Sequence, residues 1–187
     1  MGLTQEELNE LRNYKYITDD DNIRFKNIIK EKIFQDRRII HVLNNKTLDE
    51  DTPDEYIGKN IFEYYLIPGV ITDVENYICF ETKATEVLRN NQLIKIHQII
   101  FYVLCDEKNI IDVETGISRH DLLCALIKDV FNHTNYFGNK ISVVEETPSV
   151  TDNDYATRTL IFQMETPNSI VKTKNGVARV VNNKVVY

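Results

Sequence analysis

Apolar residues at helical intervals mark the N-terminal part of the chain. Thr4 and Glu7 have the spacing of a capping box, which predicts a short helix over about residues 5–12. In TDDDNIRFKNIIKEKIF, acidic residues precede a run of spaced isoleucines, as at the start of a helix whose dipole they stabilise. The next segment, DRRIIHVLNN, predicts one or two more turns that end at the Asn44-Asn45 pair. We therefore expect residues 1–45 to form an N-terminal helical segment.

The centre of the chain has the pattern of strands. NYICFETKA is followed, after a break at Asn90-Asn91, by KIHQIIFYVLCD, in which both faces of an extended chain are largely apolar. Such a strand is covered on both sides, by another layer or by another subunit. Two further strand patterns, KISVVEE and ATRTLIFQME, follow the clearest helix, GISRHDLLCALIKDVFNH. This order predicts an α+β fold, in which an antiparallel sheet of about four strands is packed by helices on one face.

Two segments fall outside this regular pattern. Residues 46–68 are acidic and irregular, and a connection of this length is usually functional or disordered. Near the C-terminus, Asn175-Gly176 lies between two runs of strand formers, which is a strong signal for a β-hairpin. A lone hairpin is marginal in water, so we expect it to pair with its own sheet or a neighbour's. Within one domain we distinguish the helical segment, an α+β core over 46–167 and a C-terminal hairpin arm over 168–187.

The composition is that of an ordinary globular protein, with 42% hydrophobic and 27% charged residues among 187. A net charge of -7 argues against nucleic-acid binding as the main task, because that task favours a basic surface. An acidic wall would instead let DNA slide past without binding. Cys79, Cys105 and Cys124 lie in apolar surroundings without a CxxC pair, and we expect buried thiols made in a reducing compartment. No apolar run approaches about 18 residues, so we expect no membrane span.

The stretch FETKATE raises one enzymatic hypothesis. On a strand, Glu81 and Lys83 would point the same way, as in the carboxylate-x-lysine strand of a metal-dependent nuclease, and Asp73 lies at a plausible separation upstream. Acid-x-lysine triplets begin at Glu81 and at Asp106, which is about as many as chance gives for this composition. No basic cluster accompanies the stretch to bind a nucleic-acid backbone. We therefore favour an ion pair as the role of these residues and keep the nuclease as an alternative.

Other catalytic and metal-binding patterns are missing from the sequence. The four histidines show neither HxxxH nor HxH spacing and have no nearby cysteine ligand. Serine nucleophile motifs and glycine-rich phosphate loops are also missing. The sequence therefore predicts no enzyme, no metal site and no cofactor.

Charged residues at the start of the clearest helix are candidates for an intersubunit interface. Arg119, His120 and Asp121 lie in the first helical turn, where a cation opposes the helix dipole and often serves a carboxylate outside the helix. The alternative for Arg119 is a local ion pair within the chain.

Arg158 is a second interface candidate, because it interrupts an otherwise apolar strand. Asp154 precedes it in the sequence and belongs to the same candidate set. The alternative is again a local ion pair, with Asp154 or Glu145 as the partner.

Taken in order, these patterns resemble the tail terminator, or tail-completion, proteins at the neck of long-tailed bacteriophages. The resemblance covers about residues 20–166 and rests on DRRIIHVLNN, EYYLIPGVITDVENYICFE, IHQIIFYVLC, TGISRHDLLCALI and DYATRTLIFQME. It implies a structural virion protein, made in the host bacterial cytoplasm, that forms a homo-oligomeric ring, typically a hexamer, at the head-tail neck. The implied partners are further copies of the chain, the tail tube protein and the head-side connector proteins.

The same resemblance implies that DNA passes through the lumen of the ring without specific binding. Candidates for an acidic lumen lining are Asp49, Glu50, Asp51, Asp54 and Glu55. The C-terminal arm has no counterpart in the family pattern, and edge pairing would let it add strands to a neighbour. The alternatives are another neck component, such as a connector or stopper subunit, and the metal-dependent nuclease.

Overall fold

Helices and strands follow each other in the order expected for an α+β protein. The computed structural model describes residues 2–13, 21–65, 75–88, 91–150, 155–167, 170–173, 176–181 and 184–186. Its helices are α1 (Gln5–Asn13), α2 (Asp21–Gln35), α3 (Arg37–Leu43) and α4 (Arg119–Phe131), with the 3-10 turns η1 (Pro53–Tyr56) and η2 (Glu107–Asn109). Its strands are β1 (Ile61–Phe62), β2 (Asn76–Leu88), β3 (Asn91–Asp106), β4 (Ser142–Val150), β5 (Tyr155–Pro167), β6 (Ile170–Thr173), β7 (Gly176–Val181) and β8 (Lys184–Val186). The predicted α+β class is confirmed.

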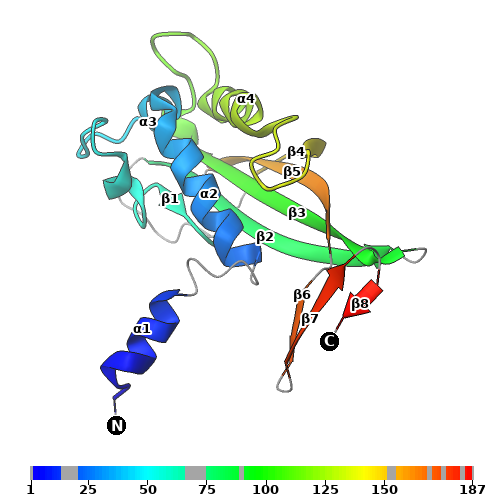
Figure 1. Ribbon diagram of the computed structural model, residues 1–187. Helices are drawn as coiled ribbons and strands as arrows, with labels where there is room; N and C mark the ends of the chain where they lie inside the picture. Colours follow the sequence, from blue (N-terminus) through cyan, green and yellow to red (C-terminus); the bar gives the residue numbers. More distant parts are fainter. Residues whose placement is uncertain are drawn as a thin grey trace.

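A five-stranded sheet with the order β1-β2-β3-β5-β4 forms the centre of the molecule (Figure 1). Strands β2, β3, β5 and β4 pair antiparallel, whereas β1 runs parallel to β2. Strand β1 was not expected from the sequence, because two residues are too few to show a periodicity. Strand β4 continues past the expected end at Glu146 to Val150 and includes Pro148. Proline fits there because β4 is an edge strand, where a missing amide hydrogen breaks no ladder.

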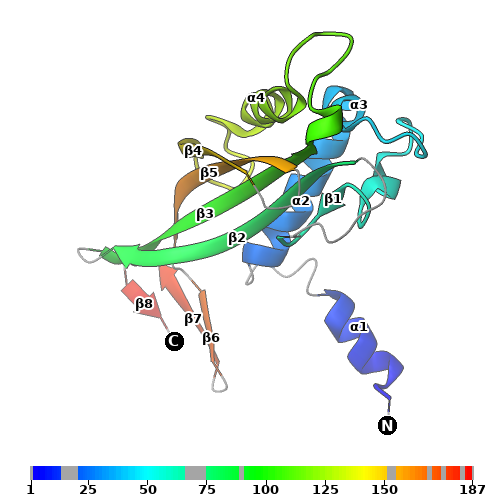
Figure 2. The same cartoon turned by 180° about the vertical axis from the view of Figure 1, so that it is seen from behind.

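Helices α2, α3 and α4 pack on one face of this sheet and bury the main core against it (Figures 1 and 2). Phe101 of β3 lies at the centre of that core and is fully buried. Its ring centroid lies 6.1 Å from Phe80, 5.3 Å from Phe131 and 5.7 Å from Phe162. The side of β3 that faces the helices contributes Ile99, Phe101, Val103 and Cys105.

The opposite face of the sheet has no helix over it among the residues that the structure describes (Figure 2). A smaller buried cluster covers one end of this face and consists of Phe62, Tyr77, Cys79, Leu104 and Tyr155. Further along, Gln98, Ile161 and Gln163 are only half-buried. Gln98 Nε2 donates to Gln163 Oε1 across the strands at 3.2 Å. The second apolar side of β3 is therefore only partly covered within the described chain.

Local signals in the sequence explain the helix boundaries. In α1 the capping box forms as predicted, since the Glu7 amide donates to Thr4 Oγ1 at 3.3 Å and the Thr4 amide to Glu7 Oε2 at 2.7 Å. Helix α3 ends at Asn44, whose φ of 52° lies in the left-handed region that asparagine tolerates. At the start of α4, the Ser118 hydroxyl donates to the Asp121 carboxylate. It does not accept a hydrogen bond from a backbone amide of the first turn, as an N-cap side chain usually does.

Strands β6, β7 and β8 form a separate three-stranded antiparallel sheet. The predicted hairpin forms, but Gly176, expected in its turn, is the first residue of β7 and pairs with Thr173; Asn175 lies outside the described residues. Strand β8 adds a third strand to this hairpin. Both views place the small sheet below the β2–β3 end of the main sheet, away from α3 and α4 (Figures 1 and 2).

Candidate assembly surface

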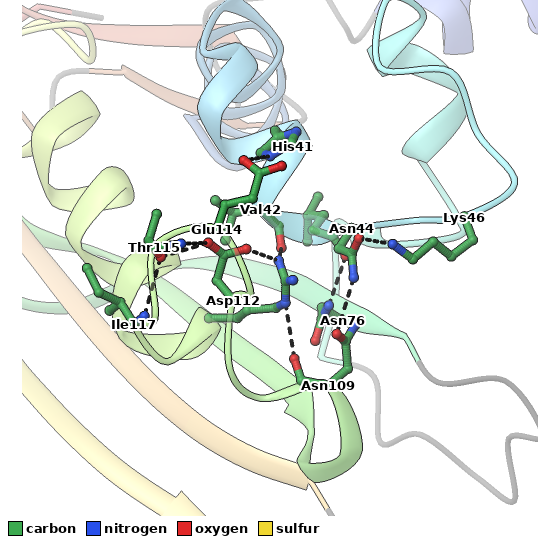
Figure 3. A network of polar contacts seen from close by, with 12 residues as sticks. His41, Val42, Asn44, Lys46, Asn76, Asn109, Asp112, Glu114, Thr115 and Ile117 are labelled. Carbon is green, nitrogen blue, oxygen red and sulfur yellow. Dashed lines mark hydrogen bonds and ion pairs between the residues drawn. The ribbon is translucent and has the colours of Figure 1, made fainter.

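Arg119, the first predicted interface residue, makes its contacts inside its own chain. Its guanidinium lies 2.9 Å from the Asp112 carboxylate, and each of the two side chains is only 5% exposed. The same guanidinium donates to the carbonyl oxygen of Asn109 at 3.1 Å and to that of Val42 at 3.2 Å (Figure 3). Arg119 thus joins the end of α3, the turn η2 and the start of α4. Because its donors are used within the subunit, we do not include it in an interface.

Asp112, the partner of Arg119, organises the loop between η2 and α4. Its Oδ2 accepts hydrogen bonds from the amide of Thr115 at 2.9 Å and from the hydroxyl of Thr115 at 2.7 Å. The Asp112 amide donates to the Ile117 carbonyl at 2.9 Å, and the Asp112 carbonyl accepts from the Gly116 amide at 2.8 Å. The Thr115 hydrogen bonds and the Arg119 charge outweigh the effect of burial and lower the pKa of Asp112. The loop is therefore closed on itself and held to the core at its base.

Arg158 takes part in a row of ion pairs that joins three elements. Its guanidinium contacts the Asp121 carboxylate of α4 and lies 3.0 Å from Glu146 of β4. Glu146 in turn lies 2.7 Å from Lys128 Nζ, and this hydrogen bond and charge lower the pKa of Glu146. Burial alone would raise the pKa of Asp121. The hydrogen bond from Ser118 and the nearby charges of His120 and Arg158 have a larger combined effect, so the pKa is lowered.

His120 lies beside this row, whereas Asp154 lies outside the described residues. His120 Nε2 is 3.6 Å from Asp121 Oδ1, and burial lowers the pKa of the imidazole. The structure therefore brings Asp121, Arg158 and His120 together on α4 and β5 and places Arg119 in the interior. Whether the three surface residues also meet another subunit stays a prediction.

The acidic residues predicted to line a lumen belong to one surface segment before β1. Four are exposed and one is half-buried: Asp49, Glu50, Asp51, Asp54 and Glu55. Arg37 pairs with Asp51 at 2.7 Å, and His41 Nδ1 lies 2.9 Å from Glu50. The hydrogen bond to Glu50, with a smaller contribution from Glu114, raises the pKa of His41. The segment is thus tied to α3 at two points while most of its carboxylates face solvent.

Three asparagines fix this acidic segment to the core from behind. Asn45 Nδ2 donates to Asn60 Oδ1 at 2.6 Å, and Asn60 Nδ2 donates to the Asn76 carbonyl at 2.9 Å. Asn76 Nδ2 completes the chain by donating to the Leu43 carbonyl at 2.9 Å. Asn60 and Asn76 are fully buried. From the sequence, Asn45 was expected only to end a helix, and this network was not predicted.

The residues of the nuclease hypothesis have other surroundings. Glu81 lies 2.7 Å from Lys26 of α2, so it forms the kind of ion pair that we favoured. Lys83 is exposed, and Asp73 lies outside the described residues. In the described part of the chain, no three His, Cys, Asp or Glu side chains come together as a metal site would require. Nothing in these contacts favours the nuclease.

The three cysteines are buried, as predicted. Burial raises the pKa of Cys105, and it raises the pKa of Cys124 to about 12. Both thiols therefore stay protonated and unreactive at neutral pH. Within the described residues, every helix is too short or too polar to cross a membrane.

Asp112 and Glu146 are the important charged residues that the sequence analysis missed. The turn pattern of Asp112 with Thr115 and Gly116 is a signal that would have identified the first. For Arg158 the expected partner on the strand was Glu145, but a bulge between Val143 and Glu145 shifts the register of β4. As a result Glu146, the next residue, shares the helix-covered side with Arg158.

Comparison with known proteins gives a family and a partial structural likeness. The profile of the YomW family matches residues 36–164, more than half of the chain. No curated protein sequence matches the chain significantly. In the structure titled "Virion of native gene transfer agent (GTA) particle", one chain has a similar fold, with a TM-score of 0.48 and 10% sequence identity. That alignment covers 76% of this chain and 94% of the other.

Proposed function

The chain belongs to the YomW family, a phage-related family, and from this membership we propose that it is a structural protein of a phage particle. In that particle, we propose, identical subunits form a ring, hexameric in the simplest case, at the neck between head and tail. The ring terminates the tail tube and joins it to the head connector. Its partners are further copies of the chain, the tube protein and the connector.

The difference between the two faces of the main sheet is the observation that supports a ring subunit. The helix-covered face is sealed, whereas the other face is only partly covered within the described residues. An uncharged stripe crosses β3 and β5 on that face and consists of Gln98, Ile100, Tyr102, Thr159, Ile161 and Gln163. Depletion of charge at the centre, with charges only at the margin, is typical of the core of a protein interface. Glu81 and Lys83 of β2 lie at this margin, opposite Ile100 and Gln98.

A ring also gives a role to the acidic segment. A contact between two different surfaces of the same chain, repeated around a closed rotation, generates a ring with a lumen. We propose that Asp49, Asp51, Asp54 and Glu55 face this lumen, where their charge would repel the DNA backbone and keep it moving. In this arrangement the small β6–β8 sheet would reach a neighbouring subunit by edge pairing.

Oligomeric mass and position in the particle test this proposal. Purified protein is analysed by size-exclusion chromatography with light scattering over a range of concentrations, and phage particles are labelled with antibody for electron microscopy. We expect a closed ring in solution and label at the neck. A strict monomer at every concentration, together with label elsewhere in the particle, would overturn the proposal.

Two variants make the mass measurement specific to the sheet face. Thr159→Arg places a long cation in the uncharged stripe and should lower the oligomeric mass. Lys140→Glu changes an exposed charge in the connection between α4 and β4, outside the stripe, and should leave the mass unchanged. To separate a terminator from a connector, tails are measured in infections that lack the protein. An uncapped tube grows overlong, whereas loss of a connector leaves tails of normal length that are not attached to heads.

A further inference from the structure

The backbone of the loop over residues 110–118 projects beyond α3 and α4, and the Glu114 carboxylate of this loop lies 3.4 Å from His41 of α3 (Figures 1 and 2). Val113 at its tip is 90% exposed, and Ile111 and Ile117 are 52% and 47% exposed. Single exposed apolar residues are ordinary, but three branched ones on one short loop expose apolar surface that is costly to hydrate. Such a loop is suited to burial against another surface.

This loop keeps one shape before it meets any partner. Its base is the buried Asp112–Arg119 ion pair, and Ile111 pairs with Ser118 across the loop. The Arg119 amide also donates to the Ile110 carbonyl at 2.6 Å. Because these contacts already order the backbone, docking of the tip would lose little conformational entropy. The loop therefore has the properties of a preformed docking element.

A groove on α2 has properties complementary to this tip. It has a volume of about 480 Å³ and lies between α2 and the segment around Ile57. Its apolar surface comes from Ile28, Phe34 and Ile57, which are only partly buried within the chain. Its polar lining consists of Arg24, Asn27, Lys30 and Glu31, two cations against one acid. Lys30 also pairs with Glu63 at 2.5 Å, which fixes the position of its ammonium group and offsets part of its charge.

We propose that the tip of the 110–118 loop of one copy docks into the α2 groove of the next copy. Val113 and its apolar neighbours would cover Ile28 and Phe34. Glu114, whose side chain is 74% exposed although it lies 3.4 Å from His41 Nε2 of its own chain, would turn toward the cations of the groove. The apolar tip with its one exposed acid suits the apolar groove, whose lining has one more cation than acid, and this match supports a second copy of the chain as the partner. This inference rests on the proposed ring, because the docked tip would be one of the contacts between neighbouring subunits of that ring.

The charges also decide between two geometries for such a contact. A tip-to-tip contact would bring Glu114 of one copy toward Glu114 of the other, which like-charge repulsion disfavours. A tip-to-groove contact joins two different surfaces, so each subunit has one tip and one groove still to use. Repetition of this contact extends or closes an assembly, as a ring requires.

Oxidative cross-linking distinguishes the two geometries directly. The native cysteines are buried and do not interfere, so single cysteines are introduced by Val113→Cys at the tip and Asn27→Cys in the groove. A mixture of the two single variants should give a cross-linked dimer, and the double variant a ladder of higher species. Val113→Cys alone should give none. A dimer from Val113→Cys alone, or no product from the mixture while the protein is oligomeric, would overturn the proposal.

Charge and apolar variants test the same contact without cross-linking. Val113→Asp and Glu114→Arg should each weaken self-association by at least about tenfold. Lys30→Glu should restore part of the association lost in Glu114→Arg. Val144→Asp is the matched control, since it places the same carboxylate at an exposed valine of β4. Circular dichroism confirms that each variant is folded.

The outcomes separate this inference from the proposed ring. If the wild-type protein is oligomeric and Val113→Asp associates as tightly as the wild type, tip docking is wrong and the ring stands. If the wild-type protein stays monomeric and the mixed cysteine variants give no product, both proposals fail.

Discussion

Replacement of Arg119 by methionine is the sharpest test of how this molecule is held together. The substitution keeps an unbranched side chain and removes the guanidinium. Asp112 then stays buried without its ionic partner, and the carbonyl groups of Val42 and Asn109 lose a donor. Three separate parts of the fold lose their common contact at once.

The expected loss of stability follows from the burial of the pair. Removal of one partner from a buried ion pair costs about 3–5 kcal/mol, because the other charge stays buried without compensation. Asp112 keeps the two hydrogen bonds from Thr115, which favours the lower end, about 3 kcal/mol. For a chain of this size each kcal/mol lowers Tm by roughly 2–4 °C, so Tm should fall by about 6–12 °C.

Urea unfolding followed by circular dichroism measures this loss, and two further variants identify its cause. Arg119→Lys keeps the charge but cannot hold three acceptors with one ammonium group, so it should lose an intermediate amount. Asp112→Asn should cost less in the Arg119→Met background than in the wild type, because the buried charge is then already unpaired. Equal costs in both backgrounds would mean that the two residues act independently.

The pH dependence gives a second check with a definite sign. The folded-state pKa of Asp112 is lowered, so its contribution is present above the unfolded pKa of about 3.9 and is lost as pH falls through the folded value. The stability difference between the wild type and Arg119→Met should therefore be largest near neutral pH and shrink below about pH 4. A loss under about 1 kcal/mol at pH 7 would refute the assigned role of the ion pair.

Three further predictions concern the core, a helix end and the acidic segment. Phe101→Ala should lower the free energy of unfolding by about 3–5 kcal/mol in urea titrations, and a loss below about 1 kcal/mol would contradict its central position. Asn44→Ala should cost about 1 kcal/mol because of its left-handed φ, whereas Asn44→Gly should cost less; the same titration distinguishes them. His41 has a raised folded-state pKa from Glu50 and Glu114, so its stabilisation is fully present below about pH 6.5 and is lost as pH rises through the folded value. The wild type should therefore exceed His41→Gln in stability more at pH 5.5 than at pH 8.5, and an equal difference at both would reject this.

Local sequence signals were sufficient for most of the fold. The capping box of Thr4 and Glu7, the spaced isoleucines of α2 and the doubly apolar pattern of β3 each depend on near neighbours, and each predicted element forms. Features that depend on distant partners were not predictable in this way. Strand β1 exists because Ile61 and Phe62 pair with β2, and two residues have no periodicity of their own.

On the candidate assembly surface, too, contacts between residues far apart in the sequence were not predictable. A first-turn arginine is expected to seek an acceptor outside its helix, and this held for Arg119. Nothing local specified that one acceptor is the carbonyl of Val42, 77 residues earlier in the chain. The bulge in β4 likewise determined that Arg158 meets Glu146. The fold therefore places Arg119 in the interior, although it was predicted at a surface between subunits.

The Asp112–Arg119 pair links the stability of the core to the shape of the 110–118 loop. Arg119→Met removes the support at the base of that loop, so under the proposed docking it should weaken self-association as well as folding. Val113→Asp changes a residue that contacts solvent, so it should weaken self-association and leave the free energy of unfolding unchanged. Measuring both quantities for both variants thus separates a loop that docks from one that only closes the fold. If Arg119→Met destabilises the subunit but assembles normally at temperatures where it stays folded, the loop has no part in assembly.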